Sequence, residues 1–187
     1  MRLFAALVPP AEVLADLADF LVPRREAGAD LRWSDSEQQH VTLAFLADVS
    51  AARLDRLVER LEAALTVAPV ALRLAGAGAF PNPYAARVLF VDVEDLGGRL
   101  GPLARRVRGA ANHAGVSVDG ARFHPHVTVA RSRRPVAATR WIRMLDTYAG
   151  PGWVAEEVEL IESHLGQGRG GRPRYVTVER FALSAGG

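Results

Sequence analysis

The stretches His40-Val41-Thr42-Leu43 and His126-Val127-Thr128-Val129 carry one pattern, His-x-Thr-hydrophobic, 86 residues apart. Each lies in a run rich in β-branched residues, which predicts a strand. Side chains two positions apart on a strand share a face, so each histidine points the same way as its threonine while the hydrophobic residues point into a core. One such tetrapeptide arises by chance, and a lone histidine in it is more often structural than catalytic. The matched pair predicts two lobes that bring two imidazoles to one substrate.

Length and composition predict a domain with a full hydrophobic core. The chain has 187 residues, of which 49% are hydrophobic, and we expect residues 1–187 to form a single domain made of two intertwined lobes. The absence of cysteine excludes disulfides, thiol nucleophiles and cysteine-ligated zinc. All 23 basic residues are arginine, which excludes Schiff-base chemistry, a Walker-loop lysine and a lysyl-nucleotide intermediate.

The amino-terminal apolar run is short. It meets Pro9-Pro10 after six residues, too few for a signal peptide, and nowhere do eighteen apolar residues run together. We therefore expect a soluble, cytoplasmic protein that does not enter a membrane.

Charge is unevenly distributed along the chain. Residues 1–98 carry 9 arginines and 14 acidic residues, whereas residues 99–143 carry 10 arginines and one acidic residue. A local excess of this size suits a polyanionic partner such as RNA. The alternative is a solvated helix face, since three of these arginines, Arg105, Arg106 and Arg108, lie on a predicted helix.

Apolar spacing and turn residues predict alternating strands and helices. We expect helices that begin near Pro10, Ser50, Asp95 and Val136, with Leu96 on the buried face of the third, and strands at 2–8, 31–33, 40–46, 70–74, 87–93, 123–131, 154–165 and 175–183. Residues 76–83 are predicted to be a loop because of their glycines and prolines. Residues 166–172 contain four glycines, but strands flank them on both sides, so we expect a mobile hairpin connection rather than a phosphate-binding loop.

Several stretches together resemble a known family. They are Leu31-Arg32-Trp33, His40-Val41-Thr42-Leu43-Ala44-Phe45-Leu46, Phe80-Pro81, Arg87-Val88-Leu89-Phe90 and Arg122-Phe123-His124-Pro125-His126-Val127-Thr128-Val129-Ala130-Arg131. The sequence resembles the 2H phosphoesterases nearly end to end. Within them it is most similar to the bacterial and archaeal RNA 2′,3′-cyclic phosphodiesterases, historically called 2′-5′ RNA ligases. Ala47-Asp48 departs from the family, which usually has glycine at this turn.

The resemblance implies an α+β, bilobal fold. Two pseudo-symmetric α/β lobes with antiparallel sheets would surround a central cleft, with the two His-x-Thr strands side by side at its floor. The implied reaction hydrolyses a terminal 2′,3′-cyclic phosphate of RNA, or of a nucleotide, to a 2′-phosphomonoester without any metal or other cofactor. The implied protein acts as a monomer on RNA ends.

The residue types fit that chemistry. Opening a cyclic phosphodiester needs a base for water and an acid for the leaving oxygen on opposite sides of phosphorus, and two imidazoles with pKa values near 6.5 can share these roles. Thr42, Thr128 and Arg131 would hold the non-bridging oxygens. By resemblance, His40 is the acid toward the 3′ oxygen and His126 is the base toward water.

Some assignments keep an alternative at this point. Phe45 matches a base-stacking aromatic residue of the family, or is an ordinary core residue; Trp33 and Phe123 are predicted to be packing residues. His124 and His126 share a strand face and would suggest a metal pair, although two ligands are too few. The alternative functions are ATP-independent 2′-5′ RNA end joining at the same site and a non-catalytic RNA-binding module.

Overall fold

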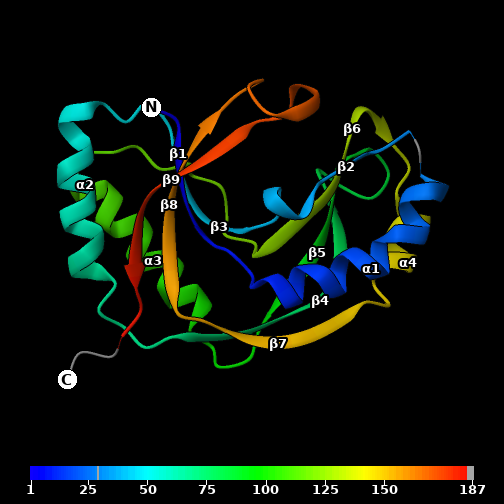
Figure 1. Cartoon of the computed structure of the whole chain (residues 1–187), viewed down its shortest axis with the longest axis horizontal. Helices are drawn as coiled ribbons and strands as arrows, with labels where there is room; N and C mark the ends of the chain where they lie inside the picture. Colours follow the sequence, from blue (N-terminus) through cyan, green and yellow to red (C-terminus); the bar gives the residue numbers. More distant parts are fainter. Residues whose placement is uncertain (29, 185–187) are drawn as a thin grey trace.

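The computed structural model describes residues 1–28 and 30–184, and it contains two antiparallel sheets that face one another (Figure 1). The four-stranded sheet has the order β3 (Val41–Leu46), β1 (Leu3–Leu7), β8 (Glu157–His164) and β9 (Arg174–Ala182). The five-stranded sheet has the order β2 (Arg32–Trp33), β6 (His126–Val136), β5 (Ala86–Asp95), β4 (Val70–Phe80) and β7 (Ala149–Ala155).

Helices cover the outer face of each sheet. Helices α2 (Ala51–Ala64) and α3 (Leu100–His113) pack together on the four-stranded sheet, and α1 (Ala11–Ala27) and α4 (Thr139–Leu145) contact the five-stranded sheet (Figure 1). The helices bury the stripes that their spacing predicts, including Leu17 and Leu21 on α1 and Leu57 and Leu61 on α2. No helix among the described residues combines the length and apolar character needed to span a membrane.

Distant parts of the chain meet in the four-stranded sheet. Strand β1 lies between β3 and β8, with Leu3 opposite Glu162 and Ala6 opposite Glu159. The predicted strand at 154–165 is two strands, because the chain leaves the five-stranded sheet at Ala155 and enters the four-stranded sheet at Glu157. Each sheet is therefore built from segments that are not consecutive in the chain.

The prediction of a loop at 76–83 is wrong for its first half. Strand β4 continues to Phe80 and pairs with β5, with a register shift between Leu74 and Ala77. Gly76 has a φ of +85° in this bulge, and Gly78 lies under the ring of Phe90, where a Cβ would approach within 2.4 Å. Glycine here serves a bulge and a close contact instead of a turn.

Two smaller expectations are also corrected. Leu96 is 49% exposed, because the helix begins only at Leu100. The carboxylate of Asp95 accepts hydrogen bonds from the amides of Arg99 and Leu100, at 3.1 and 2.8 Å, and so still stabilises the start of this helix.

Candidate functional site

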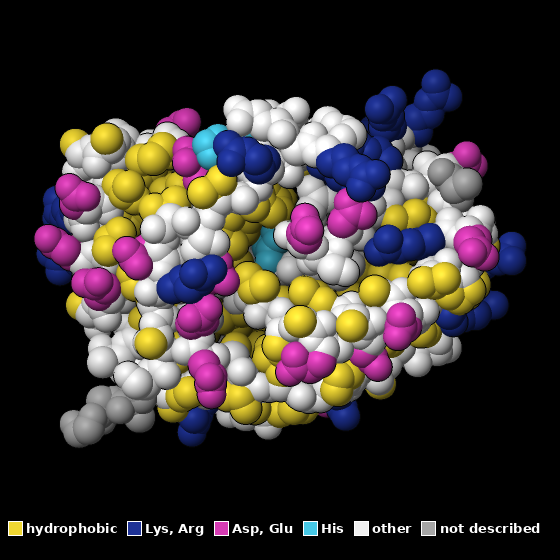
Figure 2. Space-filling view, in the orientation of Figure 1, with side chains coloured by type: hydrophobic (Ala, Val, Ile, Leu, Met, Phe, Trp, Pro, Cys, Tyr) yellow, Lys and Arg dark blue, Asp and Glu magenta, His cyan; other side chains and the backbone are white. Residues whose placement is uncertain are grey.

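A cavity of about 570 Å³ lies between the two sheets. Figure 2 shows a hollow near the middle of the face, with histidine at its base. The cavity is lined by both members of each His-x-Thr pair, by four arginines and by several aromatic residues: His40, Thr42, His126, Thr128, Arg2, Arg32, Arg131, Arg172, Phe4, Phe45, Phe80 and Tyr175. No aspartate or glutamate is among its described lining residues. The cavity therefore suits an anion with an aromatic or apolar part.

The strands that follow His40 and His126 belong to different sheets. Strand β3 begins directly after His40 and β6 begins at His126, and the two strands are not sheet neighbours. The two strands contact one another, as expected, but each forms its hydrogen bonds within its own sheet. The histidines meet across the gap between the sheets, since both line the same cavity.

Both strands have a β-bulge at the same place in the motif. In β3, Thr42 and Ala44 pair with consecutive residues of β1, which leaves Leu43 as the extra residue. In β6, Thr128 and Ala130 pair with consecutive residues of β5, which leaves Val129 as the extra residue. An extra residue moves later side chains to the other face of the strand.

The bulges determine which side chains follow the threonines into the cavity. In an unbroken strand, a residue five positions after the histidine would point away from it. The bulges instead direct Phe45 and Arg131 into the cavity and leave Ala44 and Ala130 buried. Each lobe thus contributes a histidine, a threonine and the residue five positions after the histidine.

His40 lies among aromatic rings on the four-stranded sheet. Its ring stacks on Phe4 with centroids 4.6 Å apart and meets the edge of Tyr175 at 5.4 Å. The pKa of His40 lies at about 4 instead of 6.5. Burial is the main cause, the charges of His126 and Arg131 add to it, and a hydrogen bond with the backbone of Gln38 partly opposes it. His40 is therefore neutral at pH 7 in the ligand-free protein.

His126 lies beside Phe80 and Phe90, each with a ring centroid 5.0 Å away. Its Nδ1 lies 2.7 Å from the carbonyl oxygen of His124. Burial lowers the pKa of His126, the bond to His124 raises it, and the nearby charges of His124 and Asp92 act in opposite directions. Both imidazoles thus bond with the backbone of the residue two positions earlier, and a carboxylate, that of Asp92, also acts on His126.

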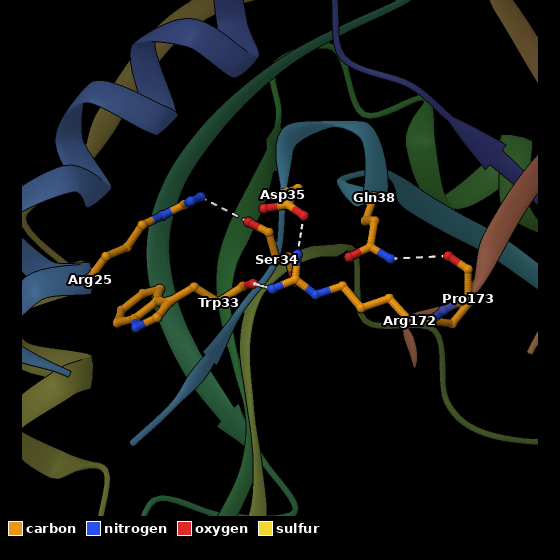
Figure 3. Close-up of polar contacts among 7 residues, drawn as sticks. All are labelled: Arg25, Trp33, Ser34, Asp35, Gln38, Arg172 and Pro173. Carbon is orange, nitrogen blue, oxygen red and sulfur yellow. Dashed lines mark hydrogen bonds and ion pairs between the residues drawn. The ribbon is translucent and has the colours of Figure 1, made fainter. Parts of the chain in front are cut away.

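A strap formed by the loop between β8 and β9 closes one side of the cavity. Figure 3 shows Arg172 donating to the Trp33 carbonyl oxygen at 2.9 Å and pairing with Asp35, while Gln38 donates to the Pro173 carbonyl oxygen at 3.2 Å. The strap thus crosses from the four-stranded sheet to the segment between β2 and β3, which leads to His40. The prediction that these glycines form a hairpin connection is confirmed.

The structure brings all six predicted site residues to one cavity: His40, Thr42, Phe45, His126, Thr128 and Arg131. Phe45 is 48% exposed, so its alternative interpretation as a core residue is wrong. Trp33 is 7% exposed and Phe123 packs on the core, which confirms both as packing residues. The sequence did not reveal Phe4, Tyr175 or Asp92, which reach the two histidines only through sheet pairing and aromatic contacts.

His124 contacts Asp92 rather than completing a metal site. Its Nε2 lies 2.7 Å from Asp92 Oδ1. Within residues 1–28 and 30–184, no cluster of three or more histidine, cysteine, aspartate or glutamate side chains is arranged to hold a metal ion.

Comparisons with known proteins agree on one family. A family model described as the 2′-5′ RNA ligase superfamily matches residues 12–167. The chain is 39% identical over 154 residues to an RNA 2′,3′-cyclic phosphodiesterase of Geobacillus stearothermophilus, a match that covers 81% of this chain and 47% of that protein. It is 34% identical over 118 residues to an RNA 2′,3′-cyclic phosphodiesterase of Aeropyrum pernix, with coverage of 63% and 65%. The matches thus span about half and just under two thirds of these two relatives.

The fold also matches solved structures. The crystal structure of Escherichia coli LigT complexed with 3′-AMP superposes with a TM-score of 0.78 at 26% identity, over 97% of both chains. This similarity confirms the predicted α+β fold with antiparallel sheets. The length of the family match and the shared fold lead to one conclusion: the chain belongs to the 2′-5′ RNA ligase superfamily.

Proposed function

We propose that this protein hydrolyses the terminal 2′,3′-cyclic phosphate of RNA to a 2′-phosphomonoester, with His40 and His126 as an acid–base pair and without a metal ion. The observation that carries the proposal is the convergence of two His-x-Thr pairs, from two different sheets, on one cavity that has arginine but no carboxylate among its described lining residues. Relatives named RNA 2′,3′-cyclic phosphodiesterase support the choice of substrate.

The proposed reaction adds one water molecule across one P–O bond. The base takes a proton from water as its oxygen attacks phosphorus, and the acid gives a proton to the 3′ oxygen as the P–O3′ bond breaks. Roughly in-line attack requires these two groups on opposite sides of phosphorus, and histidines on two facing lobes meet that requirement. Arg131 and the hydroxyls of Thr42 and Thr128 would bind the non-bridging oxygens and stabilise the charge of the transition state.

We assign His40 as the acid and His126 as the base. The Nδ1 of His126 donates to the His124 carbonyl, since a carbonyl oxygen only accepts, and this leaves Nε2 free to take a proton. His40 has a pKa of about 4 without ligand, so the acid role requires that the bound phosphate anion raises this pKa.

A cyclic substrate with sulfur in place of the 3′ oxygen tests this polarity, because a thiolate leaves without needing a proton. We expect this substrate to restore the rate of His40→Ala and to leave His126→Ala inactive. Rescue of His126→Ala alone would reverse the two roles.

The substrate is proposed to bind with its terminal base on Phe45. An exposed aromatic ring beside a phosphate site suits stacking, which every base permits. Arg133 and Arg134 continue β6 beyond Arg131 and are exposed, so they would contact the phosphates of a longer RNA. We therefore propose that RNA ends are bound in preference to mononucleotides.

The function is tested by incubating the protein with an oligoribonucleotide that ends in a 2′,3′-cyclic phosphate. We expect ³¹P NMR to show a 2′-phosphate and the rate to survive exhaustive chelation with EDTA. Loss of activity that zinc or manganese restores would contradict the metal-free mechanism. A parallel reaction with an added 5′-hydroxyl RNA and no ATP measures 2′-5′ joining, in which the hydroxyl replaces water; binding without any product would indicate an RNA-binding module.

A further inference from the structure

A chain of two short contacts links His126 to residues that do not line the cavity. Asp92 lies on β5 directly opposite His126 in the sheet. Its Oδ1 is 2.7 Å from the Nε2 of His124, and the carbonyl oxygen of His124 is 2.7 Å from the Nδ1 of His126. The catalytic imidazole is thus linked to a carboxylate through the backbone of the residue two positions earlier.

Aromatic packing holds the intermediate residue in place. The ring of His124 meets Phe80 at 5.6 Å and Phe90 at 5.1 Å, and these two rings also flank His126. Asp92 and the two phenylalanines thus restrict the half-exposed ring of His124, in the residue whose carbonyl bonds His126. That carbonyl determines which nitrogen of His126 carries the proton.

His40 also forms a hydrogen bond with the backbone of the residue two positions earlier, but no carboxylate is linked to that residue. The residue two positions before His40 is Gln38, whose amide donates to Pro173 in the strap, not to a carboxylate. Four charged or titratable groups act on His126. Two are close to it along the chain, His124 and Arg131, and two come from other strands or the opposite lobe, Asp92 on β5 and His40. Among these, Asp92 is the only carboxylate.

We infer that Asp92 and His124 are positioning residues for His126: their hydrogen bond fixes His124, whose carbonyl holds the His126 ring with Nδ1 protonated and Nε2 directed to the substrate. The inference rests on the proposed function in giving His126 a role at phosphorus. It goes beyond that function by assigning two residues that do not line the cavity.

The variant Asp92→Asn tests the inference, with Glu94→Gln as its matched control. Glu94 lies two residues further along β5 and forms an exposed ion pair with Arg73 at 2.6 Å, so both variants remove one carboxylate charge from the same strand. We expect Asp92→Asn to lower kcat roughly 10-fold and to change KM less than about twofold. The reason is that Asp92 and His124 orient His126 and do not bind the substrate themselves. Asp92→Glu restores part of the loss, and Glu94→Gln leaves kcat unchanged.

The pH profile provides a readout that a purely structural role would not move. The charge of Asp92 raises the pKa of His126, so the limb of the profile that belongs to His126 shifts to lower pH in Asp92→Asn. In Glu94→Gln this limb stays where it is in the wild-type protein. Equal kcat values and coincident profiles for Asp92→Asn and Glu94→Gln would overturn the inference.

Nitrogen-15 NMR of histidine-labelled protein tests the same point without catalysis. We expect the wild-type His126 resonances to show protonated Nδ1 at neutral pH, and Asp92→Asn and His124→Gln to show a mixture of both tautomers. Unchanged His126 resonances in both variants would overturn the inference. If the tautomers shift as expected while the wild-type protein opens no cyclic phosphate, the proposed function fails and the positioning role stands.

Discussion

The two motif strands share one backbone device and differ in what it presents. After His40 and after His126 the chain runs through valine, threonine, a bulged residue and a buried alanine, and then directs a fifth residue into the cavity. In β3 that residue is Phe45 and in β6 it is Arg131. The comparison teaches that the same strand geometry presents an aromatic ring in one lobe and a guanidinium in the other. Under the proposed function, the first binds the nucleobase of the substrate and the second its phosphate.

The two histidines also differ in their surroundings. His40 is held by rings, with Phe4 stacked on it and Tyr175 at its edge. His126 bonds with the carbonyl of His124, whose ring in turn contacts Asp92. Burial is the largest influence on the pKa of both histidines, and a backbone hydrogen bond opposes it at each. The pKa of His40 falls to about 4, whereas at His126 the charge of Asp92 also opposes the effect of burial.

The largest expected effect comes from removing either imidazole. We expect His40→Ala and His126→Ala each to lower kcat/KM roughly 10²–10⁴-fold on a cyclic-phosphate RNA, because each removes one proton transfer. The double variant should lose little more than the weaker single variant, since the pair acts as a unit. Steady-state kinetics measures this, and one fully active single variant would break the symmetry of the two lobes.

The fifth residues should give different kinetic signatures. We expect Arg131→Ala to lower kcat, because it removes about 2–4 kcal/mol of transition-state stabilisation. We expect Phe45→Ala to raise KM, because it removes the stacking of one base, which contributes about 1–3 kcal/mol to binding.

Arg133→Ala is the matched control for the arginine, because it lies on the same strand beyond the cavity. We expect it to weaken RNA binding in a salt-dependent way with kcat retained. If Arg131→Ala and Arg133→Ala lost only affinity, and to the same extent, the division of roles between the lobes would be wrong.

Burial of His40 predicts a pH-dependent stability. Its pKa is 6.5 when unfolded and about 4 when folded, so the unfolded state binds more protons within this window. The free energy of unfolding therefore falls as the pH is lowered from 6.5 toward 4, by at most about 3 kcal/mol from this residue. Urea unfolding at pH 7 and 4.5 should show a smaller loss for His40→Gln than for wild type; equal losses would contradict burial as the cause.

The smallest expected effect is in the strap. Arg172→Ala removes the bond to the Trp33 carbonyl and the ion pair with partly exposed Asp35, and we expect a cost of about 1 kcal/mol. Thermal unfolding should show a Tm lower by about 2–4 °C. Arg169→Ala, in the same loop, is the control, since its side chain makes no hydrogen bond or ion pair within the described residues. Equal Tm values for the two variants would show that the strap is not held by Arg172.

The elements with strong periodicity could be predicted from the sequence. Side chains two positions apart predicted that each histidine shares a strand face with its threonine. Apolar residues three and four positions apart predicted the buried stripes of the helices. Spacing by five could not place Phe45 and Arg131, because Leu43 and Val129 carry no local sign of a bulge. The place of Phe45 came from the family resemblance, and that of Arg131 from the need for a phosphate-binding cation close to His126. The bulges supply the physical reason for both.

Long-range contacts and the roles of two glycines could not be predicted from the sequence. Asp92 and His124 lie 32 residues apart and meet only because β5 pairs with β6. Gly76 and Gly78 read as a loop, since nothing in the sequence shows that a bulge and the ring of Phe90 require them.

The central place of β1 has a consequence for the order in which the molecule is made. Strand β1 pairs with β3, which lies within the first 46 residues. Its other edge pairs with β8, whose Glu162 lies opposite Leu3. Closing so long a stretch of chain is entropically costly and slow compared with local pairing. During synthesis, β1 thus lacks one of its two neighbours until β8 has left the ribosome, so the sheet that carries His40 is completed only after the strand that carries His126 has been made.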